Sequence, residues 1–86
     1  MTAAVRIDKL LYFLRLVKTR SEAHELSETG YIRVNGRRIE KGSCMVHAED
    51  IITFPKGDAV FAVKLLLLPE RRGSAAEARL CYQLLE

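Results

Sequence analysis

The N-terminal third of the chain alternates apolar and polar positions with the period of a helix. One side of a repeat of about 3.6 residues is apolar and comprises Ile7, Leu10, Leu11, Leu14 and Val17. The opposite side carries Asp8, Tyr12 and Arg15. This pattern predicts an amphipathic helix over residues 7–17.

A second helix is predicted between Thr19 and Gly30. Thr19 as N-cap, with Glu22 three residues later, has the spacing of a capping box, and Gly30 can supply the left-handed residue that ends a helix. Its apolar face is thin, because it consists essentially of Ala23 and Leu26. We therefore expect packing against the first helix and the following hairpin to stabilise it.

An Asn35-Gly36 pair between alternating apolar residues predicts a β-hairpin with a two-residue type I′ loop. In that register Arg33 faces Arg38 and Val34 faces Arg37, and the apolar face holds Ile32, Val34 and Ile39. Like charges directly opposite destabilise a strand pair by up to about 1 kcal/mol. The pair therefore indicates an anion bound between the two arginines, and RNA is the polyanion we expect. Alternatively, Glu40, diagonal to Arg33, neutralises the pair.

The rest of the chain predicts two strands and a third helix. Residues 51–54 and 60–68 read as strands, separated by a turn at residues 55–58. Ser74 and Glu77 repeat the capping-box spacing, and a helical repeat follows at Ala78, Cys81, Tyr82 and Leu85. The predicted fold class is α+β, with two N-terminal helices packed on a small, mostly antiparallel sheet and a C-terminal helix docked on it.

Length and charge narrow the function. We expect the 86 residues to form a single domain, 1–86, which is too short for a catalytic unit plus a separate binding module. The net charge is only +3, but residues 1–41 hold nine Lys or Arg against five Asp or Glu, whereas residues 42–86 hold five against six. A positive N-terminal half favours nucleic acid or an anionic surface as partner.

Several classes of function are disfavoured. The apolar run at residues 10–17 is interrupted by Arg15, and residues 59–68 are about half the ~20 residues that a membrane helix needs, so we expect a cytoplasmic protein without membrane contact. Cys44 and Cys81 are isolated and are expected to be reduced thiols. With His47 they lack the spacing of metal ligands. We expect no metal site and no cofactor.

No convergent catalytic set is visible either, so we do not expect an enzyme. His24 is expected to be a solvated helix residue. The aromatic residues are too few for stacking on single strands, although Tyr31 lies on the same hairpin face as Arg33 and Arg38. We expect recognition of a folded RNA by its shape.

Basic residues gather at three predicted positions. Lys18 and Arg20 flank the start of the second helix, where unpaired amides and the helix dipole attract phosphate. Arg6 and Lys9 begin the first helix, and the hairpin carries Arg33, Arg37 and Arg38. Together they can follow an RNA backbone, for which the guanidinium group is well suited. The alternative interpretation is that these are ordinary solvated charges.

The order of these motifs resembles the alpha-L RNA-binding motif of small-subunit ribosomal protein S-four. The resemblance rests on residues 6–11, on Lys18-Thr19-Arg20-Ser21 with Ala23, and on residues 30–36. It implies a motif core at residues 6–54, followed by an extension at residues 59–86. It also implies an RNA face lined by Arg6, Lys9, Lys18, Thr19, Arg20, Ser21, Asn35 and Arg38.

The stand-alone domain, followed by residues 70–74 and a segment containing Ala76-Glu77-Ala78 and Tyr82, is similar to the heat-shock protein fifteen family. This resemblance implies binding to the large ribosomal subunit through ribosomal RNA, and possible contact with tRNA, in the rescue or recycling of stalled nascent chains. We expect a monomer. The alternatives are a protein-interaction module that uses the C-terminal helix, and the RNA-targeting subunit of a separate modification enzyme.

Overall fold

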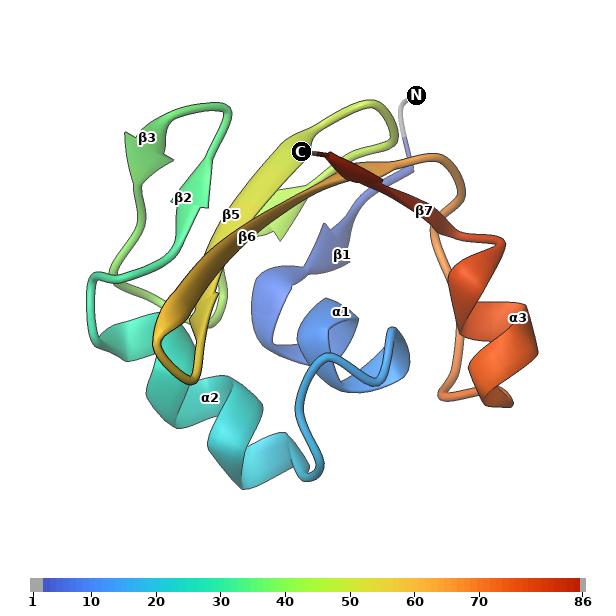
Figure 1. Ribbon diagram of the computed structural model, residues 1–86, viewed down its shortest axis with the longest axis horizontal. Helices are drawn as coiled ribbons and strands as arrows, with labels where there is room; N and C mark the ends of the chain where they lie inside the picture. The colour runs from blue at the N-terminus through green and yellow to red at the C-terminus, as the bar shows by residue number, and fades with distance from the viewer. Residues whose placement is uncertain (1–2, 86) are drawn as a thin grey trace.

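The computed structural model describes residues 3–85, which form three helices and two antiparallel sheets (Figure 1). The helices are α1 (Ile7–Phe13), α2 (Arg20–Glu28) and α3 (Ala75–Arg79). The strands are β1 (Val5–Arg6), β2 (Arg33–Val34), β3 (Arg37–Arg38), β4 (Met45–Val46), β5 (Ile51–Lys56), β6 (Ala59–Leu65) and β7 (Tyr82–Leu85). The predicted α+β class is confirmed: two N-terminal helices, an antiparallel sheet and a short C-terminal helix.

The larger sheet has the strand order β3-β2-β5-β6-β7 and arches over α1, with α2 and α3 on either side (Figure 1). β1 and β4 form a separate ladder in which Val5 lies opposite Val46 and Arg6 opposite Met45. The Ile7 N–H extends this connection by donating to the Cys44 carbonyl at 2.8 Å. The start of α1 is therefore fixed to the segment that follows the hairpin.

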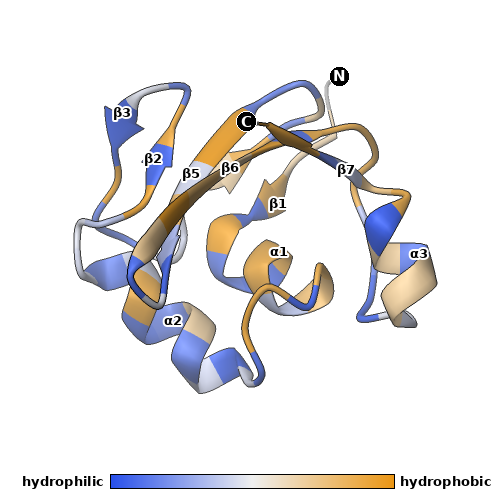
Figure 2. Cartoon of the chain, in the orientation of Figure 1, coloured by the Kyte–Doolittle hydropathy of each residue, from blue (hydrophilic) through white to orange (hydrophobic). Residues whose placement is uncertain are grey.

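The core lies between α1 and the concave side of the sheet, where the apolar residues of the helix face those of the strands (Figure 2). The fully buried side chains of α1 are Ile7, Leu10 and Leu11, and those of the two long strands are Ile52, Val63 and Leu65. Full burial of each such side chain contributes about 1.5–3 kcal/mol. Packing of this kind, rather than helical propensity, must stabilise a helix as short as α1. None of the helices within residues 3–85 is long and apolar enough to cross a bilayer.

The first helix is shorter than predicted, because it ends at Phe13 and not at Val17. Arg15 adopts φ +60°, in the left-handed region, which stops the helix. The turn nevertheless keeps Leu14 buried and packs Leu16 and Val17 against the core. The apolar spacing thus continues beyond the helix, since burial depends on where a side chain lies and not on continued helical hydrogen bonds.

The second helix forms where it was predicted. Thr19 is its N-cap, with Oγ1 accepting the Glu22 N–H at 3.1 Å. Gly30, two residues beyond the last helical residue, has φ +84°. Ala23 is buried and Leu26 half-buried, so the thin apolar face is the one that packs inward.

The hairpin also has the predicted register, with Arg33 opposite Arg38 and Val34 opposite Arg37. Asn35 and Gly36 have φ +53° and +82°, as a type I′ loop requires.

The next two strands differ from the prediction at their ends. β5 continues through Pro55 to Lys56, where a turn was expected, and β6 ends at Leu65. Proline has no N–H to donate to a ladder, but it is tolerated here because β2 pairs only with the first half of β5. Beyond Leu65 the chain turns, and the Leu66 and Leu67 N–H groups both donate to the Cys81 carbonyl.

The predicted C-terminal helix is correct at its start and wrong at its end. Ser74 and Glu77 form a complete capping box, but α3 stops at Arg79, and Tyr82–Leu85 forms β7 on the edge of β6. A short apolar run is compatible with the period of a helix and with that of a strand. Here the backbone groups along β6 gain hydrogen-bond partners because residues 82–85 pair with them as a strand. The apolar helix face that the interaction-module alternative required is therefore not formed. Cys44 and Cys81 are unpaired and half-buried.

Candidate nucleic-acid interface

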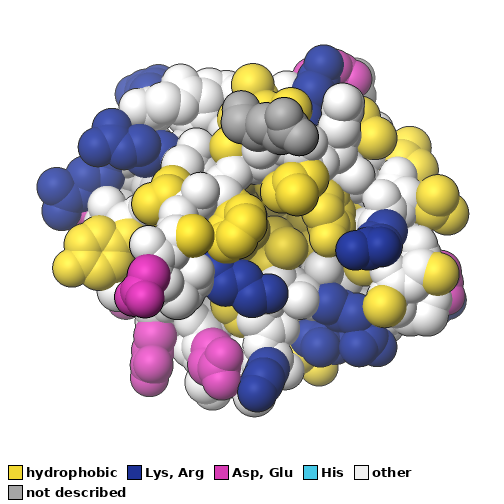
Figure 3. All heavy atoms as spheres, viewed as in Figure 1, with side chains coloured by type: hydrophobic (Ala, Val, Ile, Leu, Met, Phe, Trp, Pro, Cys, Tyr) yellow, Lys and Arg dark blue, Asp and Glu magenta, His cyan; other side chains and the backbone are white. Residues whose placement is uncertain are grey.

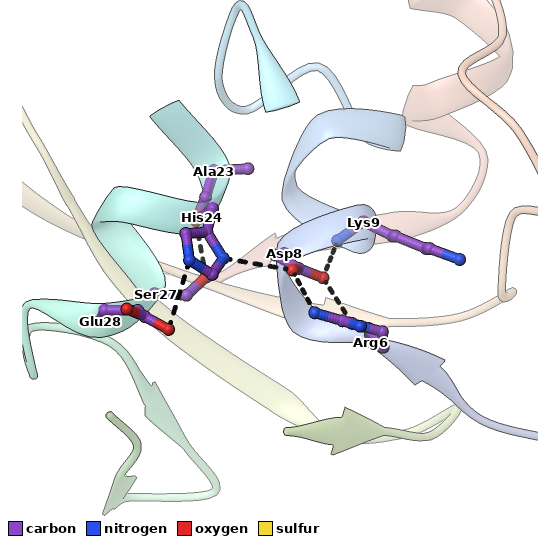
Figure 4. A network of polar contacts seen from close by, with 7 residues as sticks. All are labelled: Arg6, Asp8, Lys9, Ala23, His24, Ser27 and Glu28. Atoms are coloured by element: carbon purple, nitrogen blue, oxygen red, sulfur yellow. Dashed lines mark hydrogen bonds and ion pairs between the residues drawn. The ribbon is translucent and has the colours of Figure 1, made fainter. Parts of the chain in front are cut away.

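At the start of α1, a carboxylate of the first turn and the guanidinium of the N-cap residue Arg6 are held in one arrangement (Figure 4). The Asp8 side chain is only 8% exposed. It accepts Arg6 Nε at 3.1 Å on Oδ1 and Arg6 Nη2 at 2.8 Å on Oδ2. Oδ1 also accepts the Lys9 N–H at 2.7 Å. Because bidentate pairing restricts orientation, Asp8 positions Arg6, whose side chain is still 43% exposed.

The pKa of Asp8 reflects this arrangement. Burial alone would raise the pKa, but the hydrogen bonds from Arg6 and from the Lys9 N–H, the Arg6 charge and the contact with His24 outweigh it. The pKa of Asp8 therefore lies below its ordinary value of 3.8. The carboxylate is ionised at neutral pH and continues to position Arg6.

His24 connects the two N-terminal helices, a role that its sequence position did not reveal. Its Nδ1 lies 3.6 Å from Asp8 Oδ2 on α1, and its Nε2 lies 3.4 Å from Glu28 Oε2 one turn along α2 (Figure 4). The i,i+4 relation to Glu28 could have been read from the sequence, whereas the contact with Asp8 depends on helix packing. Gly42 passes close by, since a β-carbon built there would lie 2.8 Å from Asp8 Oδ2.

A surface depression of about 430 Å³ lies beside this network. It is lined by Asp8 and His24 together with Arg20, Ser21 and Glu25. Arg20 and Ser21 belong to the first turn of α2, where the dipole favours an anion. The Thr19 hydroxyl is occupied as the helix cap, and Lys18, just before it, is exposed.

A second depression, of about 310 Å³, lies against the hairpin. Its lining includes Arg37, Arg38 and Met45. Arg6 lines neither depression but neighbours both, because its guanidinium pairs with Asp8 of the first and its strand partner Met45 lines the second. We call this set of cations the basic surface: Arg6, Arg20, Arg37 and Arg38, with the adjacent Lys18 and Arg33.

The cations of the basic surface differ in how far they are neutralised. Arg6 pairs with Asp8, and Arg38 Nε lies 3.3 Å from Glu40 Oε1. The predicted neutralisation by Glu40 therefore occurs, but on Arg38 and not on Arg33. Within residues 3–85 no carboxylate lies within 4.0 Å of the charged groups of Lys18, Arg20, Arg33 or Arg37. These four are available to phosphate.

Two of the predicted site residues have other surroundings. Asn35 Nδ2 donates to Asp50 Oδ1 at 3.0 Å, and Asn35 Oδ1 accepts the Ile51 N–H at 2.8 Å, so this side chain anchors the hairpin to β5. Lys9 lines a separate depression with Phe13 and points away from Asp8 and His24 (Figure 4). The structure thus places Arg20 and Ser21 at one depression and Arg37 and Arg38 at another, and it leaves Lys9 apart.

Comparison with known proteins matches this region to one family. The family model of the S4 domain matches residues 5–52, which contain all of the basic surface. A heat shock protein 15 homologue of Aeromonas salmonicida is 38% identical over 82 residues, covering 95% of this chain and 61% of that protein. Heat shock protein 15 of Escherichia coli K12 is 37% identical over 79 residues, covering 92% of this chain and 59% of that protein. The chain thus spans about three fifths of the length of these curated relatives.

A solved structure agrees with both matches. Heat shock protein 15 of Vibrio cholerae superposes with a TM-score of 0.89 at 32% identity, covering 96% of this chain and 83% of that one. That protein is trimeric. This finding contradicts the expectation of a monomer. The sequence offered no signal for assembly, because an interface has no distinctive local pattern.

Proposed function

The chain belongs to the S4 domain family and is a homologue of heat shock protein 15 over most of its length, and from this premise we propose that its basic surface binds structured RNA of the large ribosomal subunit. One observation carries the proposal. Cations that are separate in sequence lie at two surface depressions, and Arg6 neighbours a residue that lines each of them.

The side chains of the basic surface are better suited to binding a phosphate backbone than to binding bases. Arg20 lies in the first turn of α2, where a phosphate would meet backbone amides and a guanidinium together. Arg37 presents a second guanidinium that no carboxylate neutralises within residues 3–85. Aromatic side chains that could stack on bases are few, with Tyr31 the exposed one. Such a surface selects the spacing of phosphates in a folded RNA.

The cellular role follows from the family resemblance. We propose that the protein acts in the cytoplasm on large subunits that retain a nascent chain on tRNA, and that it contacts ribosomal RNA and tRNA there. Its action would be binding in support of rescue or recycling rather than catalysis. Because the Vibrio cholerae relative is trimeric, we also propose that this chain self-associates, which sedimentation equilibrium of the purified protein would measure.

Gradient sedimentation of tagged protein from stressed cells tests the proposal. We expect the wild type to travel with large subunits and an Arg20→Glu, Arg37→Glu variant to remain at the top of the gradient. The matched control is Lys56→Glu, Arg79→Glu, which makes the same charge change at two residues that line a different depression. If both variants leave the large subunit equally, net charge rather than the basic surface is responsible and the proposal is wrong.

A further inference from the structure

An apolar hollow lies on the concave side of the sheet, between the end of α1 and α3, and none of its lining residues belongs to the basic surface. Its volume is about 320 Å³. Its apolar walls include Leu16, Phe54, Phe61, Tyr82 and Leu84. Figure 3 shows apolar side chains around the hollow at the centre of the view, with basic groups beside them. Leu84 is 57% exposed, so the hollow is open to solvent on the side that β7 forms.

The hollow borders an open sheet edge, because β7 is the last strand of the sheet and pairs with nothing else within residues 3–85. The direction of its backbone groups follows from β6. Leu65 donates its N–H to the Asp50 carbonyl at 2.9 Å and accepts the Glu49 N–H at 2.8 Å, so both of its backbone groups point away from β7. Tyr82 lies opposite Leu65. In an antiparallel ladder the backbone groups of Tyr82 then point to the open edge.

Because backbone groups alternate in direction along a strand, those of Leu84, two residues further along β7 and opposite Val63, also point to the open edge. The two residues whose N–H and C=O groups face the open edge are thus the same two whose side chains wall the hollow. A strand added to this edge would gain backbone hydrogen bonds and place every second side chain over the hollow.

Two cations also line the hollow, Lys56 at the end of β5 and Arg79 at the end of α3. Within residues 3–85 no carboxylate lies within 4.0 Å of the charged group of either. An occupant that carries a carboxylate is therefore favoured. Pairing of β7 with β3 of a second copy is disfavoured, because β3 consists of Arg37 and Arg38. Pairing of β7 with β7 of a second copy brings no carboxylate from residues 82–85 to Lys56 and Arg79.

We propose that β7 and this hollow bind an extended acidic peptide of another protein. The peptide adds to β7 as a sixth strand, places alternate apolar side chains in the hollow and sets an Asp or Glu against Lys56 and Arg79. This site shares no residue with the basic surface, and it stands or falls independently of RNA binding.

Selection from a displayed library of random peptides on the immobilised full chain tests the proposal. We expect enriched sequences that alternate apolar and other residues and that include Asp or Glu. The most enriched peptide, synthesised with fluorescein, is then titrated with protein and followed by fluorescence polarisation. N-methylation of its backbone at alternate residues should weaken binding about tenfold or more in one of the two registers, because hydrogen bonds to Tyr82 and Leu84 are lost.

Protein variants complete the test. Leu84→Asp and Lys56→Glu, Arg79→Glu should each weaken the peptide about tenfold or more, and the second pair changes only side chains at the rim. The control is Leu80→Asp, at a residue that is 70% exposed but lies outside the hollow, and it should bind as the wild type does. RNA affinity should be unchanged in all three. Failure to enrich any peptide, enrichment without the pattern, or equal binding by all variants overturns the proposal.

Discussion

Arg72 caps the end of α1 through Tyr12: its Nη1 donates to the Tyr12 carbonyl at 2.9 Å, and its guanidinium carbon lies 4.4 Å from the centroid of the Tyr12 ring. The same Nη1 donates to the Val17 carbonyl at 3.2 Å. Carbonyls in the last turn of a helix have no partners within the helix. The Tyr12 carbonyl accepts the Arg15 N–H at 3.1 Å, and Arg72, 60 positions away, supplies a second donor that stabilises the early end of α1.

We expect Arg72→Ala to lower the free energy of unfolding by about 2 kcal/mol, because charge-assisted hydrogen bonds and a cation–π contact are lost together. Arg71→Ala is the matched control, since Arg71 makes only an exposed pair with Glu77 at 3.5 Å and should change stability by less than about 0.5 kcal/mol. Urea unfolding followed by circular dichroism measures both. Equal losses for the two variants would show that Arg72 does not cap α1.

The features predicted correctly from the sequence are those decided within a few residues. The Thr19 and Ser74 caps and the type I′ loop at Asn35 depend on side chains and backbone angles of immediate neighbours. The hairpin register followed directly from the loop, and with it the position of Arg38 opposite Arg33. Local chemistry thus predicted how the hairpin presents Arg33 and Arg38.

The errors arose where distant segments decide the outcome. Arg15 turns out of the helix and donates its Nε to the Gly73 carbonyl, 58 residues away. Tyr82–Leu85 forms a strand because the edge of β6 is available to it. Asp8 and His24 meet only when α1 packs on α2. None of these partners can be read from the neighbouring sequence.

Glycine substitutions should separate backbone strain from crowding. Gly30 and Gly36 have φ +84° and +82°, but only Gly30 has a neighbour, since a β-carbon there would lie 2.5 Å from Arg38 Nη2. The Arg38 guanidinium is exposed and can move aside. We therefore expect Gly30→Ala and Gly36→Ala to cost a similar ~1 kcal/mol of strain in urea unfolding. A much larger cost for Gly30→Ala, relieved by adding Arg38→Ala, would show that the guanidinium is rigid.

The lowered pKa of Asp8 predicts a pH dependence of stability. Because the folded-state pKa is below the ordinary value of 3.8, the contribution is complete above that value and is lost as the pH falls through the folded-state pKa. The difference in unfolding free energy between wild type and Asp8→Asn should therefore be larger near pH 6 than at a pH below the folded-state pKa. Urea titrations at several pH values measure this difference. A difference that stays constant as the pH falls would contradict the assignment.

Asn35 should act on stability through its side chain and not only through its turn geometry. Asn35→Gly keeps a residue that accepts φ +53° but removes the hydrogen bonds to Asp50 and to the Ile51 N–H. We expect a loss of about 1–2 kcal/mol in urea unfolding, at about 1 kcal/mol for each hydrogen bond. Hydrogen exchange at Ile51 should speed up in the variant, and unchanged exchange there would show that Asn35 does not anchor the hairpin.

The unequal neutralisation of the basic surface predicts how single residues affect RNA binding. Arg37 has no carboxylate within 4.0 Å among residues 3–85. Arg37→Ala should therefore make the slope of log affinity against log salt less steep by about 0.7 to 0.9, because one counterion fewer is released on binding. Arg38→Ala should lower it less, because Arg38 already pairs with Glu40 at 3.3 Å. Filter binding to a structured ribosomal RNA fragment over a range of salt measures these slopes.

Glu40→Gln should have the opposite effect on RNA binding, because removing this carboxylate frees Arg38 for phosphate. It should raise RNA affinity at low salt and steepen the slope, and the gain should vanish when Arg38→Ala is added. Glu49→Gln is the matched control, since Glu49 pairs with Lys64 at 3.0 Å outside the basic surface and should leave the slope nearly unchanged. A gain in affinity that is equal for the two glutamine variants would mean that RNA affinity depends on the overall charge of the protein and not on the arrangement of the basic surface.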